Sequence, residues 1–216
     1  MIISRGRRYI FVHIPKTGGT ALSLALEARA MKDDILIGDT PKAVRRRRRL
    51  KAATAAGRLW KHSTLADIDG LVSRDEFDAM LLFTLVRNPW DRMVSYYHWL
   101  REQTFSHPAV GLARTLEFAA FLQHPQTQGA VPAAPYGWYL TDAAGVERAA
   151  HFARLEHLDT DLAPVEAHLG FALDDIPRVN TSGRDRDYRR YYHDATAEIV
   201  ASVCERDIER FGYSFG

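Results

Sequence analysis

The chain has 216 residues, 46% of them hydrophobic and 26% charged, and its 29 Lys and Arg nearly balance its 27 Asp and Glu. These values are typical of an ordinary globular protein, and the length suits a single domain over residues 1–216. The formal charge of +2 gives no overall positive field for holding nucleic acid. Any anion site must therefore be local.

The lone cysteine and the first residues bear on the compartment. Cys204 has no second cysteine to pair with, so we expect a packing role for it in a reducing environment. Residues 1–14 carry charges after the first apolar positions, and their apolar run is too short for a signal or a membrane span. We expect a cytoplasmic protein without a transmembrane segment.

The first predicted unit runs from a strand through a glycine turn into a helix. Residues 9–14 form a short run rich in Ile, Val and aromatics, which predicts a buried strand that ends at Pro15. We expect its one polar residue, His13, to be buried and hydrogen-bonded. Residues 20–31 show helical spacing of apolar side chains, with Thr20 as the expected N-cap.

A basic segment follows at residues 40–69, which we expect to be helical or partly mobile. It contains the run Arg45 to Arg49. This run is interpreted either as a solvated helix face, as a patch for an anionic acceptor, or as a contact for nucleic acid or anionic lipid.

The second predicted unit repeats the order of strand and helix. Residues 80–86, "MLLFTLV", predict a buried strand, and Arg87 follows it directly. Asn88 as N-cap and Pro89 at the first helical position start a helix that we expect to reach about Glu102. Two such units predict an α/β fold with a mostly parallel central sheet flanked by helices on both sides.

The remaining elements are predicted less sharply. Residues 124–140, rich in Pro, Gly and aromatics, indicate an ordered loop. Residues 149–158 predict a strand, and residues 159–171 a helix capped by Asp159 or Thr160.

The last periodic stretch, residues 187–211, predicts one long amphipathic helix. Its expected core-facing residues are Ile199, Val203 and Ile208.

Two candidate anion sites lie at the carboxyl ends of the predicted strands, where ligands of such sheets bind. In "PKTGGT" the glycines allow close approach of the backbone, and amides at the start of the helix point at an anion. Lys16 adds a positive charge, and the hydroxyls of Thr17 and Thr20 can donate hydrogen bonds. Because Lys16 precedes Gly18 and Gly19, this is not the ATP-binding P-loop, in which Lys follows the glycines.

The second candidate combines Arg87 with Ser95, two helical turns apart on one side of the predicted helix. An arginine at a strand end can make a bidentate contact to a phosphate. The alternative is that Arg87 only pairs with Asp91 at the helix start.

Together the motifs resemble those of sulfotransferases that use 3'-phosphoadenosine 5'-phosphosulfate (PAPS), of the carbohydrate sulfotransferase type. That family has an "hhPKTGGT" loop after the first strand and an "RNPxxRxxSxY" segment after a later one, and here the second reads "RNPWDRMVSYY". The resemblance continues at "ARLEHLDTDL", "RVNTS" and "CERDIERFGYSF". It implies the P-loop NTPase-like sulfotransferase fold.

The resemblance also implies roles for single residues. The 5'-phosphosulfate would lie on Lys16, Thr17, Gly18, Gly19 and Thr20, and the 3'-phosphate on Arg87 and Ser95. Ser182, Gly183 and Arg184 are candidates for a basic loop that closes over the 3'-phosphate. Trp60, Tyr136 and Trp138 are possible stacking partners for the adenine.

For catalysis, Lys16 is expected to neutralise charge on the leaving group, and His62 is the candidate base, since relatives often carry a His at this place. An acidic residue is the rival for the base. The histidines are scattered without ligand spacing, so we expect no metal.

The resemblance implies a carbohydrate, glycoconjugate or small-molecule acceptor with a hydroxyl or amine. The expected cytoplasmic location without a membrane anchor departs from the Golgi members of that family, so we expect a bacterial-type enzyme. Two alternatives stay open: a nucleotide or small-molecule kinase, and a non-catalytic member of the fold that binds a nucleotide or a glycan.

Overall fold

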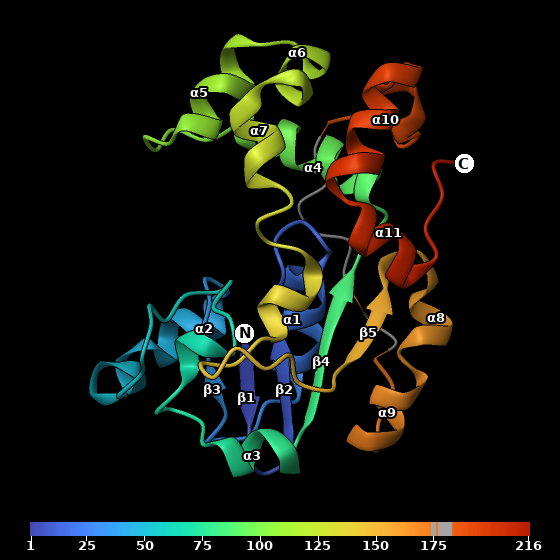
Figure 1. Ribbon diagram of the computed structural model, residues 1–216. Coiled ribbons are helices and arrows are strands. Elements are labelled where there is room, and N and C mark those ends of the chain that lie inside the picture. The colour runs from blue at the N-terminus through green and yellow to red at the C-terminus, as the bar shows by residue number, and fades with distance from the viewer. Residues whose placement is uncertain (174–175, 177–182) are drawn as a thin grey trace. The chain divides into compact units, whose positions relative to one another are not determined.

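The computed structural model describes residues 1–173, 176 and 183–216 (Figure 1). The chain divides into two compact units. One comprises Met1–Val86 with the described part of Tyr136–Val179, and the other comprises Arg87–Pro135 with the described part of Asn180–Gly216. We call them the sheet unit and the helical unit. The predicted single domain over residues 1–216 is not tested by this division and stays a prediction.

The sheet unit is built on five strands in the order β3-β1-β2-β4-β5. Strands β2, β4 and β5 pair in parallel, whereas β1 pairs antiparallel with both β2 and β3. Their bounds are β1 Ile2–Ser4, β2 Tyr9–Val12, β3 Ile35–Leu36, β4 Leu81–Val86 and β5 His151–Arg154. The predicted α/β fold with a central sheet flanked by helices is confirmed. The antiparallel pair follows from the tight turn after β1, which leaves no room for a crossover helix.

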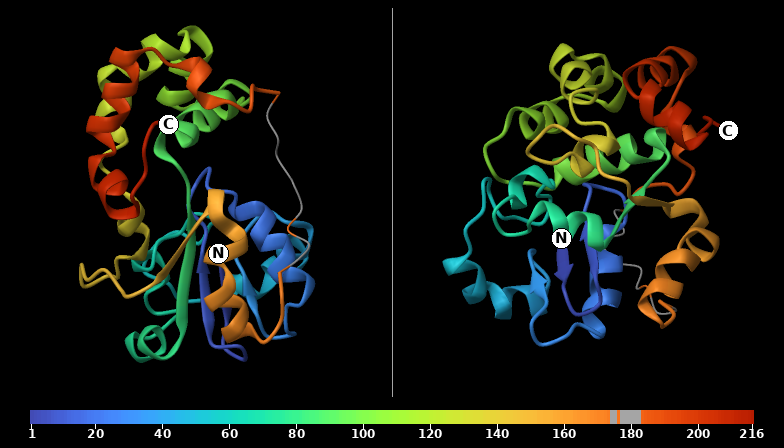
Figure 2. Two further views of the ribbon diagram at one scale, coloured as in Figure 1. Left: turned by 90° about the vertical axis from the view of Figure 1, so that its right-hand side faces the viewer. Right: turned by 60° about the horizontal axis from the view of Figure 1, so that its bottom comes forward.

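Helices and turns of this unit cover the sheet. Figure 2 shows α1 on one side of the sheet and the turn η3 on the other. Their bounds are α1 Gly19–Ala28, α2 Pro41–Arg46, η1 Arg47–Ala52, η2 Ala66–Ile68, α3 Arg74–Ala79, η3 Tyr136–Leu140, η4 Leu155–His157, α8 Leu158–Asp161 and α9 Ala163–Leu169.

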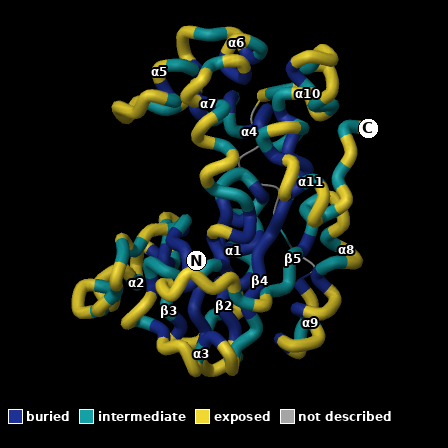
Figure 3. Tube along the Cα trace, in the orientation of Figure 1, coloured by how far each residue is buried: buried dark blue, intermediate teal, exposed yellow. Residues whose placement is uncertain are grey.

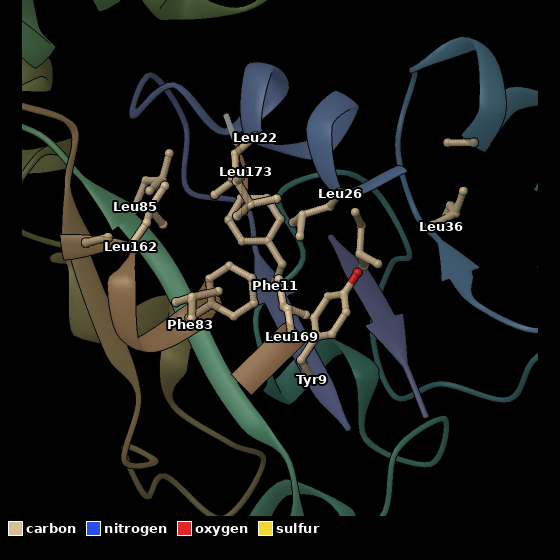
Figure 4. Packing of buried hydrophobic residues seen from close by; sticks show 14 residues of the cluster. Tyr9, Phe11, Leu22, Leu26, Leu36, Phe83, Leu85, Leu162, Leu169 and Leu173 are labelled. Carbon is tan, nitrogen blue, oxygen red and sulfur yellow. The ribbon is translucent and has the colours of Figure 1, made fainter. Parts of the chain in front are cut away.

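The core of the sheet unit lies between the sheet and helices α1 and α9 (Figure 4). Phe11 and Phe83 occupy paired positions of β2 and β4, and their rings are 5.2 Å apart between centroids. Both are fully buried, together with Leu22 of α1 and Val165 of α9. Because side chains alternate along a strand, this packing fixes the register of β2 against β4. It thereby places Pro15 and Arg87 just beyond the carboxyl ends of neighbouring strands.

The helical unit has its own apolar cluster, which includes Trp90, Tyr97, Phe121 and Val200. Figure 3 shows the buried parts of its helices in dark blue. Its elements are α4 Pro89–Arg101, α5 Pro108–Thr115, α6 Phe118–Gln123, α7 Pro125–Ala130, η5 Tyr188–Tyr191, α10 Asp194–Val203 and α11 Glu205–Phe211.

The start of α4 is as predicted. The Asn88 side chain accepts hydrogen bonds from the amides of Trp90 and Asp91, and Pro89 occupies the first turn. Pro is tolerated there because the first amides of a helix have no intrahelical acceptor. Arg87 is thus held between the end of β4 and a well-defined helix start.

Three predicted elements were wrong. Residues 124–140 form α7 and η3 instead of a loop, since Pro125 stands at the start of α7, where it costs no hydrogen bond. The predicted helix at 159–171 is two helices, α8 and α9, neither of which is capped by Asp159 or Thr160. Pro164 lies in the first turn of α9, so a new helix begins there.

The predicted long helix at 187–211 is divided into η5, α10 and α11, with Cys204 between the last two. Val200 and Cys204 are the buried apolar residues there, whereas Ile199, Val203 and Ile208 are partly buried. Burial raises the pKa of the Cys204 thiol to about 12, so it is protonated at neutral pH. The predicted packing role of Cys204 is confirmed.

Candidate functional site

The loop between β2 and α1 turns sharply to present the start of α1. Lys16 and Gly18 both have left-handed backbones, with φ of 66° and 88°. Helix α1 begins at Gly19 with Gly18 as N-cap, and no side chain of the described residues caps it. The first amides of a helix lack intrahelical acceptors and carry the positive end of its dipole. The start of α1 is therefore a candidate place for an anion, and the predicted anion site stays a prediction.

Thr20 is not the N-cap that the sequence suggested. The left-handed conformation at Gly18 lets the chain enter the helix one residue before Thr20, which stands in the first turn of α1. The Thr17 hydroxyl donates to the Ile14 carbonyl at 2.9 Å and is fully buried. Thr17 thus braces the loop through its side chain, and only its backbone amide remains for a ligand.

Packing and backbone conformation favour glycine at both Gly18 and Gly19. A Cβ on Gly18 would lie 2.7 Å from Leu155 Cδ1, and one on Gly19 would lie 2.1 Å from His13 Cδ2. The buried His13 ring leaves no room for a side chain at Gly19, and the left-handed backbone favours glycine at Gly18. The expected burial of His13 is confirmed, since its side chain is 6% exposed.

His62 contacts His13. Its Nδ1 is 2.8 Å from the His13 carbonyl oxygen, and the two imidazole rings are 4.7 Å apart in an edge-to-face arrangement. A carbonyl oxygen only accepts hydrogen bonds, so Nδ1 carries the hydrogen and Nε2 keeps its lone pair. Burial is the main cause that lowers the pKa of His62 to about 4. His62 is therefore neutral at pH 7 and can accept a proton at Nε2.

The three aromatic candidates for the adenine differ in exposure. Tyr136 is fully buried in the sheet unit, so its ring has no face to offer and this suggestion was wrong. Trp60 and Trp138 are 42% and 47% exposed. Trp60 also contacts His62 edge to face at 5.0 Å. Trp60 is thus the exposed aromatic ring beside the candidate base.

The helical unit holds the second group of predicted residues. Arg87 Nε and Nη2 both donate to Asp91 Oδ2, at 2.9 and 2.6 Å, and Arg184 Nη2 donates to Asp91 Oδ1 at 2.7 Å. Ser95 is buried one turn further along α4. The pairing of Arg87 with Asp91 that the sequence offered as an alternative is present. It also brings Arg87 and Arg184 together on one carboxylate.

Sequence reasoning missed the central position of Asp91 and the close contact of the His13 ring with Gly19 of the loop. The spacing of Arg87 and Asp91 signalled one ion pair, but Arg184 lies 93 residues from Asp91. Ser182 and the "RVNTS" motif lie outside the described residues, so their expected role is neither supported nor opposed.

Two arginines of the basic run Arg45 to Arg49 make hydrogen bonds within the fold. Arg46 Nη1 donates to the Met31 carbonyl at 2.7 Å and Arg49 donates to the Lys32 carbonyl. Both arginines thereby fasten α2 and η1 to the turn that follows α1. Arg45, Arg47 and Arg48 are exposed.

Within the described ranges, no group of three or more His, Cys, Asp or Glu side chains is placed to hold a metal ion. The part of the chain that the structure describes contains no helix with the length and apolar character needed to span a membrane.

A glycine turn between a parallel strand and the start of a helix is typical of α/β proteins that bind anions. The sequence profile of the sulfotransferase family matches residues 1–214. The chain belongs to the sulfotransferase family, and the prediction of a sulfuryl-transferring enzyme is confirmed at this level.

A solved structure shares the fold. It is the crystal structure of mouse sulfotransferase SULT7A1 complexed with PAP, which is 18% identical in sequence and aligns with a TM-score of 0.54 over 95% of this chain and 85% of the mouse chain. No curated protein matched the sequence.

The contact between Gly19 and His13 gives a testable expectation. Gly19→Ala places a methyl group against the buried His13 ring, and we expect it to destabilise the fold by about 1–3 kcal/mol, as overpacking of cores does. Gly38→Ala is the matched control, because its Cβ would lie 3.9 Å from its nearest neighbours. Urea unfolding of both variants measures this, and equal stability of the two would contradict the packing described.

The lowered pKa of His62 predicts how the stability of the fold depends on pH. The free histidine pKa of about 6.5 falls to about 4 in the fold, so between these values the unfolded chain binds a proton that the folded chain excludes. Stability should therefore fall as the pH drops from 6.5 to 4. Nitrogen NMR of the ring should show a neutral, Nδ1-protonated imidazole throughout pH 5–8. An Nε2-protonated ring, or titration near pH 6.5, would contradict the assignment.

Proposed function

We propose that the chain transfers a sulfuryl group from PAPS to a hydroxyl or amine of a carbohydrate or glycoconjugate. The observation that carries this is the left-handed turn of Lys16 and Gly18 into the uncapped start of α1. Within a sulfotransferase, that arrangement suits the phosphosulfate of the donor. The PAP bound by the mouse sulfotransferase of similar fold supports the same donor.

Two groups of residues are proposed to bind the two phosphate ends of the donor. The amides of Thr17, Gly18, Gly19 and Thr20, with the Lys16 ammonium, would hold the 5'-phosphosulfate. Arg87, Ser95 and Arg184 would hold the 3'-phosphate. An arginine fork and a hydroxyl are well matched to phosphate oxygens, and Asp91 orients both guanidinium groups toward one place.

The proposed reaction is an in-line displacement at sulfur. The bond between sulfur and the 5'-phosphate oxygen breaks while a bond forms between sulfur and the acceptor oxygen or nitrogen. Lys16 and the loop amides stabilise the charge that the leaving phosphate gains. His62 Nε2 takes the proton that the acceptor loses. The products are the sulfated acceptor and 3'-phosphoadenosine 5'-phosphate (PAP).

The acceptor is proposed from the resemblance and from the surroundings of His62. Trp60, exposed beside His62, provides an apolar face of the kind on which sugar rings stack. The exposed arginines Arg45, Arg47 and Arg48 would favour an acidic glycan. Cytoplasmic location and a bacterial-type origin stay predictions.

Binding of PAP tests the donor. We expect calorimetry to show PAP binding that exceeds ATP binding at least tenfold, with or without magnesium, because Lys16 precedes the glycines and does not fit the ATP loop. Selective tight binding of ATP with magnesium would overturn the proposal in favour of a kinase. PAP binding without turnover on any glycan acceptor would favour the non-catalytic alternative.

The role of His62 is tested by His62→Asn, which keeps an N–H near the position of Nδ1 but removes the basic nitrogen. We expect turnover with labelled PAPS to fall about 100-fold or more, with the affinity for PAP unchanged within twofold. The matched control is His168→Asn, since His168 also contacts a backbone carbonyl through a ring nitrogen, Arg7 O at 2.9 Å. Turnover of His62→Asn equal to that of His168→Asn would remove His62 from the mechanism.

A further inference from the structure

The helical unit contains two buried nitrogen atoms that lack a hydrogen-bond partner among the described residues. They are His98 Nε2 and Arg184 Nη1. Buried polar atoms are nearly always hydrogen-bonded, because an unpaired one loses its water without replacement. These two nitrogen atoms are therefore available for hydrogen bonds to a ligand.

His98 belongs to a row of polar residues on α4, and Arg184 pairs with the first of them. Asp91, Ser95 and His98 are spaced four and three residues apart, so they share one face of the helix. Asp91 Oδ1 accepts from Arg184 Nη2 at 2.7 Å, which ties Arg184 to the first of these residues. Ser95 lies between the two ends of the group.

Tyr191, from the segment after Arg184, packs against His98 of α4. The ring of Tyr191 lies edge to face on His98 at 5.2 Å. The Tyr191 hydroxyl accepts from the backbone amide of Asp185 at 2.8 Å. Tyr191 thus contacts both His98 and Asp185, the residue that follows Arg184.

The chemistry of the unpaired atoms defines the ligand. The Arg184 guanidinium can only donate hydrogen bonds. A ligand that contacts both atoms must accept from Arg184, and a negatively charged, oxygen-rich group such as a phosphate accepts most strongly from a guanidinium. In the proposed function, Arg87 and Ser95 of the same unit bind the 3'-phosphate of the donor. This phosphate is therefore the group that could also contact His98 and Arg184.

We propose that His98 contacts the donor's 3'-phosphate together with Arg184 and takes up a proton when this phosphate binds. This inference rests on the proposed function and adds a ligand and a pH dependence to it. His98 then distinguishes donors that carry the 3'-phosphate from nucleotides that lack it.

The charges around His98 give the direction of the effect. Burial, then Arg184, then Arg101 lower the pKa of the His98 ring below its ordinary value, and Glu102 opposes them. The other rings against it, Tyr97 and Tyr191, are phenols that are uncharged at neutral pH. The His98 imidazole is therefore neutral at pH 7 before PAP binds.

A phosphate dianion beside this imidazole raises its pKa. As the pH rises through the pKa of the occupied state, the bound proton is lost and the affinity for PAP weakens. Below the lower pKa of the empty state, His98 is already protonated and the uptake stops. The window for measurement is pH 6.5–8.5, above the second pKa of the phosphate itself, which is about 6.

The experiment is titration calorimetry of PAP in buffers of different ionisation enthalpy. At pH 7.5 we expect the wild-type chain to take up a substantial fraction of one proton. In His98→Gln the uptake should vanish and the affinity for PAP should fall about tenfold. Adenosine 5'-phosphate, which lacks the 3'-phosphate, should bind both proteins equally. His107→Gln, an exposed histidine at the start of α5 in the same unit, should behave as wild type.

A second measurement does not depend on a variant that folds. Nitrogen NMR of His98 in the wild-type chain should change from a neutral to a doubly protonated ring when PAP is added at pH 7.5. PAP binding with an unchanged His98 ring, or with equal proton uptake in His98→Gln, would overturn the role of His98 alone. Failure of the wild-type chain to bind PAP would overturn the proposed donor, and this inference with it.

Discussion

The ring of His13 is the contact on which the candidate catalytic centre of the sheet unit depends. Gly19 lies against one part of this buried ring, so close that a methyl group has no room. His62 lies against it as well, and His62 Nδ1 donates to the His13 carbonyl. One residue directly after β2 thereby positions the candidate anion-binding loop and determines the tautomer of the candidate base. Because a neutral backbone carbonyl orients the imidazole, the fold avoids the free-energy cost of burying a charged partner there.

Asp91 has the corresponding position in the helical unit. Its two oxygens hold Arg87, at the end of β4, and Arg184, from the far end of the sequence. A single carboxylate cannot neutralise two guanidinium groups, so the cluster keeps a positive charge for an anion. The unpaired nitrogen atoms of His98 and Arg184 extend this cluster along α4. An ion pair between Arg87 and Asp91 and a phosphate site are therefore compatible, although the sequence presented them as alternatives.

Predictions from the sequence succeeded where the signal was local. The apolar runs of β2 and β4, the cap at Asn88 and the glycine turn all act within a few residues, and each was found in place. They failed where tertiary packing decides. Pro125 starts α7, where a loop was predicted, and Pro164 lies in the first turn of α9, where the interior of one helix was predicted. Tyr136 was a candidate stacking partner because it is aromatic, but its side chain is fully buried in the core.

The sequence by itself determined the family, the two anion motifs and the strand ends that carry them, because these depend on residue order along short segments. Only the tertiary structure decided which groups surround each motif. The contact of His62 with His13 joins residues 49 positions apart, and that of Arg184 with Asp91 joins residues 93 apart. No periodicity encodes such pairs, since they arise when the sheet register and the helix packing bring distant segments together.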